Sequence, residues 1–123
     1  MLINFISCQR DISSCNCNRI DIYGILHDIT FIVRISEDDI RRGGISGQIT
    51  DQKQIDRVKK LILNLDLLSK DYDGIDVKVV LDLICKNGGK STILLNEYIL
   101  QIGNEFYEPN DSLIKLIEQQ LKI

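Results

Sequence analysis

The sequence predicts an α+β fold in which a mainly antiparallel sheet packs against two amphipathic helices. Three observations support this prediction. Apolar residues alternate along residues 76–86, which is the period of a β-strand. Apolar residues at helical spacing follow Asp51 and Asn110. The pairs Asn87-Gly88 and Gly103-Asn104 separate β-segments by tight turns, and tight turns join antiparallel neighbours.

The chain of 123 residues fits a single domain, with residues 1–19 as an N-terminal strand and loop segment and residues 20–123 as an α+β core. Its hydrophobic content of 44% and charged content of 27% are typical of a soluble globular protein. The net charge is −3, so there is no basic surface of the kind that nucleic acid requires. We therefore expect no nucleic-acid partner.

The N-terminal segment is predicted to hold a strand with Ile3, Phe5 and Cys8, followed by a polar loop over residues 7–19. The start MLINFISC also resembles the end of a bacterial lipoprotein signal, which makes Cys8 a candidate lipidation site. It lacks the basic region and the longer apolar core of a complete signal. No apolar run reaches the roughly eighteen residues of a membrane-spanning helix, so none is expected.

The next segment predicts a strand and a short helix. Apolar residues alternate from Ile29 to Ile35, and Ser36 precedes three acidic residues, two arginines and a glycine, the order of a capped helix. Arg41 and Arg42 form a candidate polar contact beside a GGISG segment predicted to be a flexible loop. Residues 44–47 match the GXXG of a KH domain but lack its basic residue.

The clearest helix begins at Asp51, with Gln54 placed as in a capping box, and is predicted to extend to about Ser69. Its core-facing residues are Ile55, Val58, Leu61, Ile62, Leu65 and Leu68. At about 100° per residue, Leu63 and Leu67 project to the opposite side. These two leucines are the predicted partner surface, and replacing both by aspartate is expected to prevent association without unfolding the chain.

Residues 76–86, 91–102 and 105–108 are predicted to form a three-stranded meander, the second segment being bent near Glu97. A last helix is capped by Asn110, Asp111 or Ser112 and buries Leu113, Leu116, Ile117 and Leu121. The acidic stretch 71–76 is predicted to be a turn. Val80 stands where a calcium loop needs glutamate, so no calcium site is expected.

The stretch KNGGKST, residues 86–92, contains the Gly-Lys-Ser of a phosphate-binding loop. Ile84 stands where that loop requires its first glycine, and β-favouring residues follow in place of a helix. We therefore predict a hairpin turn around Asn87-Gly88 and no nucleotide cofactor.

No chemistry emerges from the cysteines or from the single histidine. Cys8, Cys15, Cys17 and His27 do not have the spacing of a zinc site, and the cysteines are expected to be free thiols unless the protein is exported. Cys85 is predicted to be a small core residue. The adjacent residues His27 and Asp28 would point to opposite faces of a strand. No catalytic residue, metal or cofactor is predicted.

These exclusions favour a small, non-catalytic, cytoplasmic module that binds another protein or itself, such as an inhibitor, immunity or assembly component. Three alternatives stay open. The first is a bacterial envelope protein anchored by lipid at Cys8, the second is a viral or particle structural protein, and the third is a small enzyme that uses its acidic residues.

Overall fold

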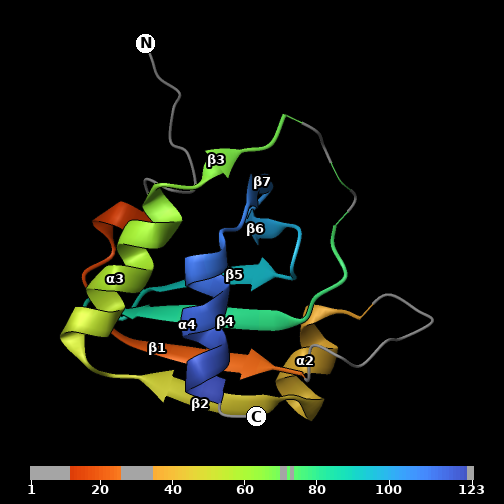
Figure 1. Cartoon of the computed structure of the whole chain (residues 1–123). Helices are drawn as coiled ribbons and strands as arrows, with labels where there is room; N and C mark the ends of the chain where they lie inside the picture. The colour runs from red at the N-terminus through yellow and green to blue at the C-terminus, as the bar shows by residue number, and fades with distance from the viewer. Residues whose placement is uncertain (1–11, 26–34, 70–71, 73, 122–123) are drawn as a thin grey trace.

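The fold is α+β and is built on one open antiparallel sheet. A computed structural model describes residues 12–25, 35–69, 72 and 74–121. In this part of the chain seven strands form a single sheet in the order β2-β1-β4-β5-β6-β7-β3 (Figure 1). Every neighbouring pair of strands is antiparallel.

Strands β1 and β4 are neighbours in the sheet although they lie far apart in the sequence. The strands are β1 (Cys17–Gly24), β2 (Ile45–Ile49), β3 (Asp66–Leu67), β4 (Val79–Cys85), β5 (Lys90–Leu95), β6 (Leu100–Ile102) and β7 (Glu105–Glu108). The helices are α2 (Glu37–Gly43), α3 (Gln52–Leu63) and α4 (Asp111–Leu121). Residues 12–14 are also helical.

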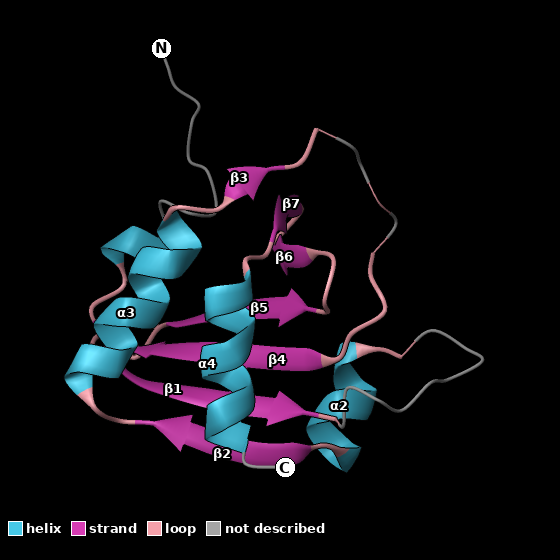
Figure 2. Ribbon diagram, in the orientation of Figure 1, coloured by secondary structure: helices cyan, strands magenta, loops and turns pink. Residues whose placement is uncertain are grey.

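Helices α3 and α4 cover one face of the sheet (Figure 2). The apolar face of each helix is buried as its spacing predicts, and both predicted amphipathic helices are confirmed. The buried helix residues are Ile55, Val58 and Ile62 of α3 and Leu113, Leu116, Ile117 and Leu121 of α4. Alternate residues of the strands meet them, including Ile20, Ile22, Leu81, Leu83 and Ile93, all fully buried. This is the main core.

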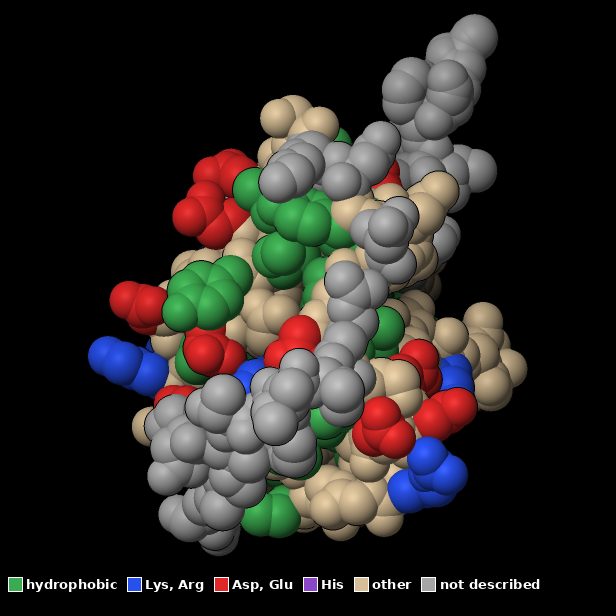
Figure 3. Space-filling view, turned by 90° about the vertical axis from the view of Figure 1, so that its right-hand side faces the viewer, with side chains coloured by type: hydrophobic (Ala, Val, Ile, Leu, Met, Phe, Trp, Pro, Cys, Tyr) green, Lys and Arg blue, Asp and Glu red, His purple; other side chains and the backbone are tan. Residues whose placement is uncertain are grey.

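A second, smaller apolar cluster lies on the opposite face of the sheet. It joins Ile40 of α2 to Val80 and Phe106 of the strands, together with Ile75 and Val77 of the segment that leads into β4. Figure 3 views this end of the molecule and shows acidic side chains spread around a central group of hydrophobic ones. The opposite face is therefore covered at one end, by α2 and the residues before β4.

Of the starts of α2, α3 and α4, two are capped by side chains. Ser36 Oγ accepts the Asp39 amide at 3.3 Å and the Asp39 carboxylate accepts the Ser36 amide at 3.0 Å, which completes a capping box. Asn110 Oδ1 accepts the Leu113 amide at 2.8 Å at the start of α4. Asp51 stands at the N-cap position of α3, as predicted, but its side chain makes no capping bond.

This difference gives a matched pair of substitutions. Ser36→Ala should lower the free energy of unfolding by about 1 kcal/mol, because a free amide of the first turn loses its acceptor. Asp51→Ala should cost less than about 0.5 kcal/mol, because no bond is lost. Urea denaturation of both variants beside the parent chain measures the difference. Equal losses in the two variants would contradict the capping geometry.

The segment KNGGKST is a hairpin turn between β4 and β5. The Gly88 amide donates to the Cys85 carbonyl at 3.0 Å, and the Gly89 amide donates to Asn87 Oδ1 at 2.9 Å. Gly88 has φ 92°, a left-handed conformation that favours glycine. Since β5 follows and no helix does, the predicted turn is confirmed.

The predicted single β-segment over residues 91–102 is wrong, because the chain reverses within it. Asn96 Oδ1 accepts the amides of Tyr98 and Ile99 at 2.8 and 3.0 Å, and its own amide donates to the Ile99 carbonyl. This turn pairs β5 with β6, so the meander has four strands, β4 to β7. A side-chain turn of this kind is a local property of asparagine that apolar alternation conceals.

Other boundaries also differ from the prediction, including the end of α3, which lies at Leu63 and not at about Ser69. Residues 43–47 were expected in a flexible loop, but residues 45–47 belong to β2 (Ile45–Ile49), because the whole of β2 pairs with β1. Residues 17–19 were expected in a loop but belong to β1. Strand β4 begins at Val79, three residues after the predicted start. The predicted strand over residues 29–35 and the one with Ile3 and Phe5 lie outside the described residues, apart from the buried Ile35.

Candidate functional site: an open sheet edge

Strand β2 forms one edge of the sheet. Its pairing with β1 runs from Ile20 opposite Ile49 to Gly24 opposite Ile45. No described residue pairs with its other side. The strand reads Ile-Ser-Gly-Gln-Ile, so it carries neither a charge nor a proline, the features with which proteins protect sheet edges. Ile45 is 41% exposed. Within the described ranges, the outer backbone N–H and C=O groups of β2 are therefore available to another strand.

Helix α4 fixes β2 from one face. A Cβ added at Gly47 would lie 2.9 Å from the Gln120 carbonyl oxygen, so glycine permits the close approach of helix and strand. On the other face, an open depression of about 340 Å³ is lined by Asp21, Tyr23, Ser46, Gly47 and Gln48. Gln48 donates to Asp21 at 3.1 Å and ties β2 to β1. The edge strand is thus held in place, while no strand of the described part of the chain covers its outer side.

The opposite edge of the sheet is built differently. Strand β3 is only two residues long, and its Asp66 lies opposite Glu108 of β7. Short length and acidic side chains both disfavour pairing with a further strand. Leu67 is 59% exposed on this edge. The two edges therefore differ in length and in charge, and β2 is the more accessible one.

The predicted surface of Leu63 and Leu67 does not exist as a helix stripe. Helix α3 ends at Leu63, where Asn64 donates from its side chain to the Lys60 carbonyl at 2.9 Å and so satisfies a group of the last turn. Leu63 is partly buried against the main core, and Leu67 stands on β3. The proposed double aspartate substitution would therefore disturb the core at Leu63 as well as the surface at Leu67.

Arg41 and Arg42, the predicted polar contact, have different partners and do not form one surface. Arg42 is exposed and pairs with Asp39 at 3.2 Å within its own helix. Arg41 forms a two-point ion pair with Asp82 of β4, through Nη1 at 2.7 Å and Nη2 at 2.9 Å. Its Nε donates to Glu37 at 2.8 Å. Arg41 is thereby committed to an internal role.

Asp82 of β4 is not among the functional residues predicted from the sequence. It is 3% exposed, the one buried charged residue in the described ranges, and accepts a further hydrogen bond from Thr92 at 2.8 Å. The Arg41 guanidinium carbon lies 5.4 Å from the centre of the Tyr23 ring. A lone carboxylate in the apolar run VVLDLIC was a signal for such a buried pair.

The ionisation of this pair is fixed by its contacts. Burial of the Asp82 carboxyl raises its pKa, but the hydrogen bonds from Arg41 and Thr92 and the nearby charges of Arg41 and Lys90 together hold that pKa below its usual value. The hydrogen bond to Asp82 raises the pKa of Arg41. Both groups are therefore charged at neutral pH, and Asp82 is not a proton donor.

The cysteines differ from the prediction of free thiols. Cys15 and Cys85 form a disulfide with a Cα–Cα distance of 5.3 Å, so Cys85 is a linked residue within the core. Cys17 is free and buried. Among the described residues, no three His, Cys, Asp or Glu side chains are grouped so that they could share a metal ion. Cys8 and His27, the candidates for lipidation and for metal or base chemistry, lie outside the described residues.

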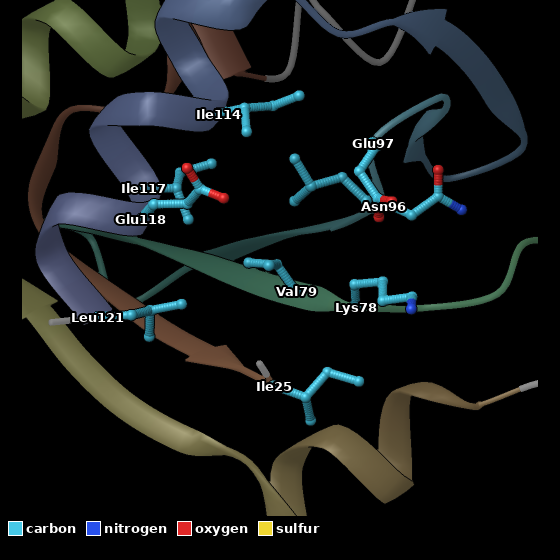
Figure 4. A pocket seen from close by; sticks show the side chains of 10 residues that line it. Ile25, Lys78, Val79, Asn96, Glu97, Ile114, Ile117, Glu118 and Leu121 are labelled. Atoms are coloured by element: carbon cyan, nitrogen blue, oxygen red, sulfur yellow. The ribbon is translucent and has the colours of Figure 1, made fainter. Parts of the chain in front are cut away.

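An apolar groove lies between α4 and the adjacent ends of β1, β4 and β5 (Figure 4). Ile117 and Leu121 of α4 face Val79 of β4 across it, and Glu97 and Glu118 lie at its margin. Its volume is about 40 Å³, enough for a water-sized guest and far below the roughly 300 Å³ at which ligand pockets begin. The groove is therefore too small to enclose a drug-sized ligand.

None of the helices in the described part of the chain has the length and apolar character that a membrane crossing requires. Comparison with models of known protein families, with curated proteins and with solved structures found no match.

Proposed function

We propose that this chain is a small, non-catalytic protein-binding module that takes up an extended segment of its partner along β2. The observation that carries the proposal is the unprotected outer side of β2, which has five residues without charge or proline. In this binding mode, backbone hydrogen bonds to an added strand provide affinity and side chains on alternate positions provide selectivity.

The side chains beside the β2 edge define the segment that would fit. Ile45 offers an exposed apolar contact on the α4 side, whereas Ser46 and Gln48 offer polar contacts on the other. A partner strand with apolar residues on one face and hydroxyl or amide residues on the other complements both faces. An inhibitor, immunity or assembly component fits this description, with a second copy of the chain as one form of partner.

The disulfide favours a location other than the predicted cytoplasm. Linked cysteines persist in oxidising compartments and are rare in the cytosol. The bond between Cys15 and Cys85 therefore favours an exported or surface-bound protein. The second candidate function is therefore that of an envelope protein, and the sequence suggests that it is anchored by lipid at Cys8. Intact mass of the protein from its native host tests it, since loss of residues 1–7 with added lipid is the expected result.

Positive charge on the edge strand should abolish binding at β2. With a partner identified by pull-down and mass spectrometry, Ile45→Lys is expected to weaken its affinity at least tenfold, about 1.4 kcal/mol, because an inserted charge would be buried beside the added strand. Isothermal titration of the purified pair measures the change. For self-association, sedimentation equilibrium is the measurement.

Leu67→Lys is the matched control, since Leu67 is exposed on the opposite edge. It should leave affinity unchanged. Binding that tolerates Ile45→Lys but fails with Leu67→Lys would place the partner on β3 and contradict the proposal. So would a chain that neither self-associates nor binds any partner in an edge-dependent way.

A further inference from the structure

Three cysteines meet where β1 lies beside β4. Cys15 is bonded to Cys85, and Cys17 is the β1 partner of Cys85, next to a shift of the β1–β4 register between Cys17 and Arg19. All three are buried in the main core, and none is more than 9% exposed. Directly opposed residues of antiparallel strands have Cα atoms about 4.5 to 5.5 Å apart, within the range that a disulfide spans. Cys85 therefore has two cysteines within reach.

The backbone aligns both candidates with Cys85. The Lys86 amide donates to the Asn16 carbonyl at 2.9 Å, so the segment Cys15-Asn16-Cys17 runs beside the end of β4. Residues two apart in an extended chain point to the same side, which agrees with the burial of Cys15 and Cys17 in one cluster. The Cys17 thiol donates a hydrogen bond to the Arg19 carbonyl at 3.2 Å. It takes part in no disulfide.

Helix α3 brings charge to the same place. Lys59 Nζ donates to the Cys15 carbonyl at 2.6 Å, and its positive charge lowers the pKa of Cys17. Burial raises that pKa by more, and the negative charge of Asp56 adds to the rise. Cys17 is thus a protonated thiol at rest, and Lys59 favours the thiolate whenever local opening admits water.

We propose that Cys15, Cys17 and Cys85 form an intramolecular thiol–disulfide exchange site in which Cys17 can replace Cys15 as the partner of Cys85. The Cys17 thiol gives its proton to water, and the thiolate attacks Cys85 Sγ. The Cys17–Cys85 bond forms as the Cys15–Cys85 bond breaks, and Cys15 leaves as a thiolate that takes up a proton. One disulfide and one thiol are present before and after, so no oxidant is required.

The exchange would change how the N-terminal segment is held. With Cys15 linked, residues 12–16 are joined covalently to β4, and Ile12 is fully buried in the main core. With Cys17 linked, the bond lies within the β1–β4 pairing, and residues 12–16 are held by noncovalent contacts alone. The exchange would therefore determine whether residues 12–16 are linked covalently to β4, and it would do so without involving the β2 edge.

Trapping and peptide mapping test the exchange in the full chain carrying Cys8→Ser. The protein is incubated at mildly alkaline pH, then denatured at mildly acidic pH in excess N-ethylmaleimide, which caps whichever thiol is free. Trypsin releases residues 11–19 linked to residues 79–86, and fragmentation on either side of Asn16 assigns the cap to Cys15 or Cys17. We expect the capped fraction of Cys15 to rise at least tenfold above its starting share during incubation.

Two variants sharpen the result. Cys15→Ser, held in a glutathione redox buffer, should form the Cys17–Cys85 disulfide, whereas Cys17→Ser should retain Cys15–Cys85 without change over time. A cap found on Cys17 alone after every incubation overturns the proposal. A folded Cys15→Ser variant that keeps both thiols reduced also overturns it. Should Cys15→Ser fail to fold, the trapping result on the three-cysteine chain decides.

Discussion

Reduction of the disulfide is expected to lower the free energy of unfolding by about 4 kcal/mol. The linked residues are 70 apart in sequence, and the chain-entropy model assigns a closed loop of this length that much restriction of the unfolded state. Domains of this size are typically stable by about 5–15 kcal/mol, so the reduced protein would lose a large share of its stability. Urea denaturation with and without a phosphine reductant, followed by circular dichroism, measures the loss.

Two alanine variants show which cysteines carry this effect. Cys85→Ala removes the shared partner, and its denaturation midpoint should not respond to reductant. Cys15→Ala should keep part of the response, because Cys17 can then bond to Cys85. An unchanged midpoint of the parent chain on reduction would show that the disulfide contributes nothing to stability.

The parts of the fold that the sequence predicted correctly depend on neighbouring residues. Ser36 caps α2 because its hydroxyl lies three residues before a free amide, and Gly88 turns the β4–β5 hairpin because glycine accepts a left-handed conformation. The buried faces of α3 and α4 follow from helical spacing in the same way. Each of these features is encoded within a few positions of the chain.

Two of the features that were predicted wrongly depend on distant residues. Residues 43–47 contain three glycines and a serine and were predicted to be a loop, but residues 45–47 are part of β2 because β1 pairs with them. The apolar spacing through Leu65 and Leu68 predicted a helix to about Ser69, but α3 ends at Leu63, and Asp66 and Leu67 pair with β7. Local pattern carries no information on which distant strand is available, so tertiary pairing overrode propensity in both places.

The candidate edge could not be identified from sequence for the same reason. Whether a strand lies at the edge depends on the order of all seven strands, and β2 was not recognised as a strand. The absence of charge and proline in residues 45–49 was visible, but it becomes meaningful only once the strand is placed at the edge. The pairing of Cys15 with Cys85 likewise depends on β1 lying beside β4.

Asp82→Ala is expected to lower the free energy of unfolding by about 3 kcal/mol, because it leaves the Arg41 guanidinium without its principal counter-charge. The value lies at the low end for a buried pair, since Arg41 is 24% exposed and retains Glu37. Thr92 also loses the acceptor of its hydroxyl. Urea denaturation of the variant at neutral pH measures the loss.

A variant that removes both charges distinguishes the contribution of the ion pair to stability from the contribution of the space that the Asp82 side chain fills. Asp82→Ala combined with Arg41→Met should cost less than Asp82→Ala alone, because no unpaired charge is left next to β4.

The dependence of stability on acid pH provides a second test. The folded-state pKa of Asp82 is depressed, so its contribution is present above the ordinary aspartate pKa of 3.8 and is lost as the pH falls through the lower, folded value. The stability difference between the parent chain and Asp82→Ala should therefore shrink over that range. A difference that is constant with pH, together with a double variant less stable than Asp82→Ala, would show that the carboxylate acts by filling space and not by its charge.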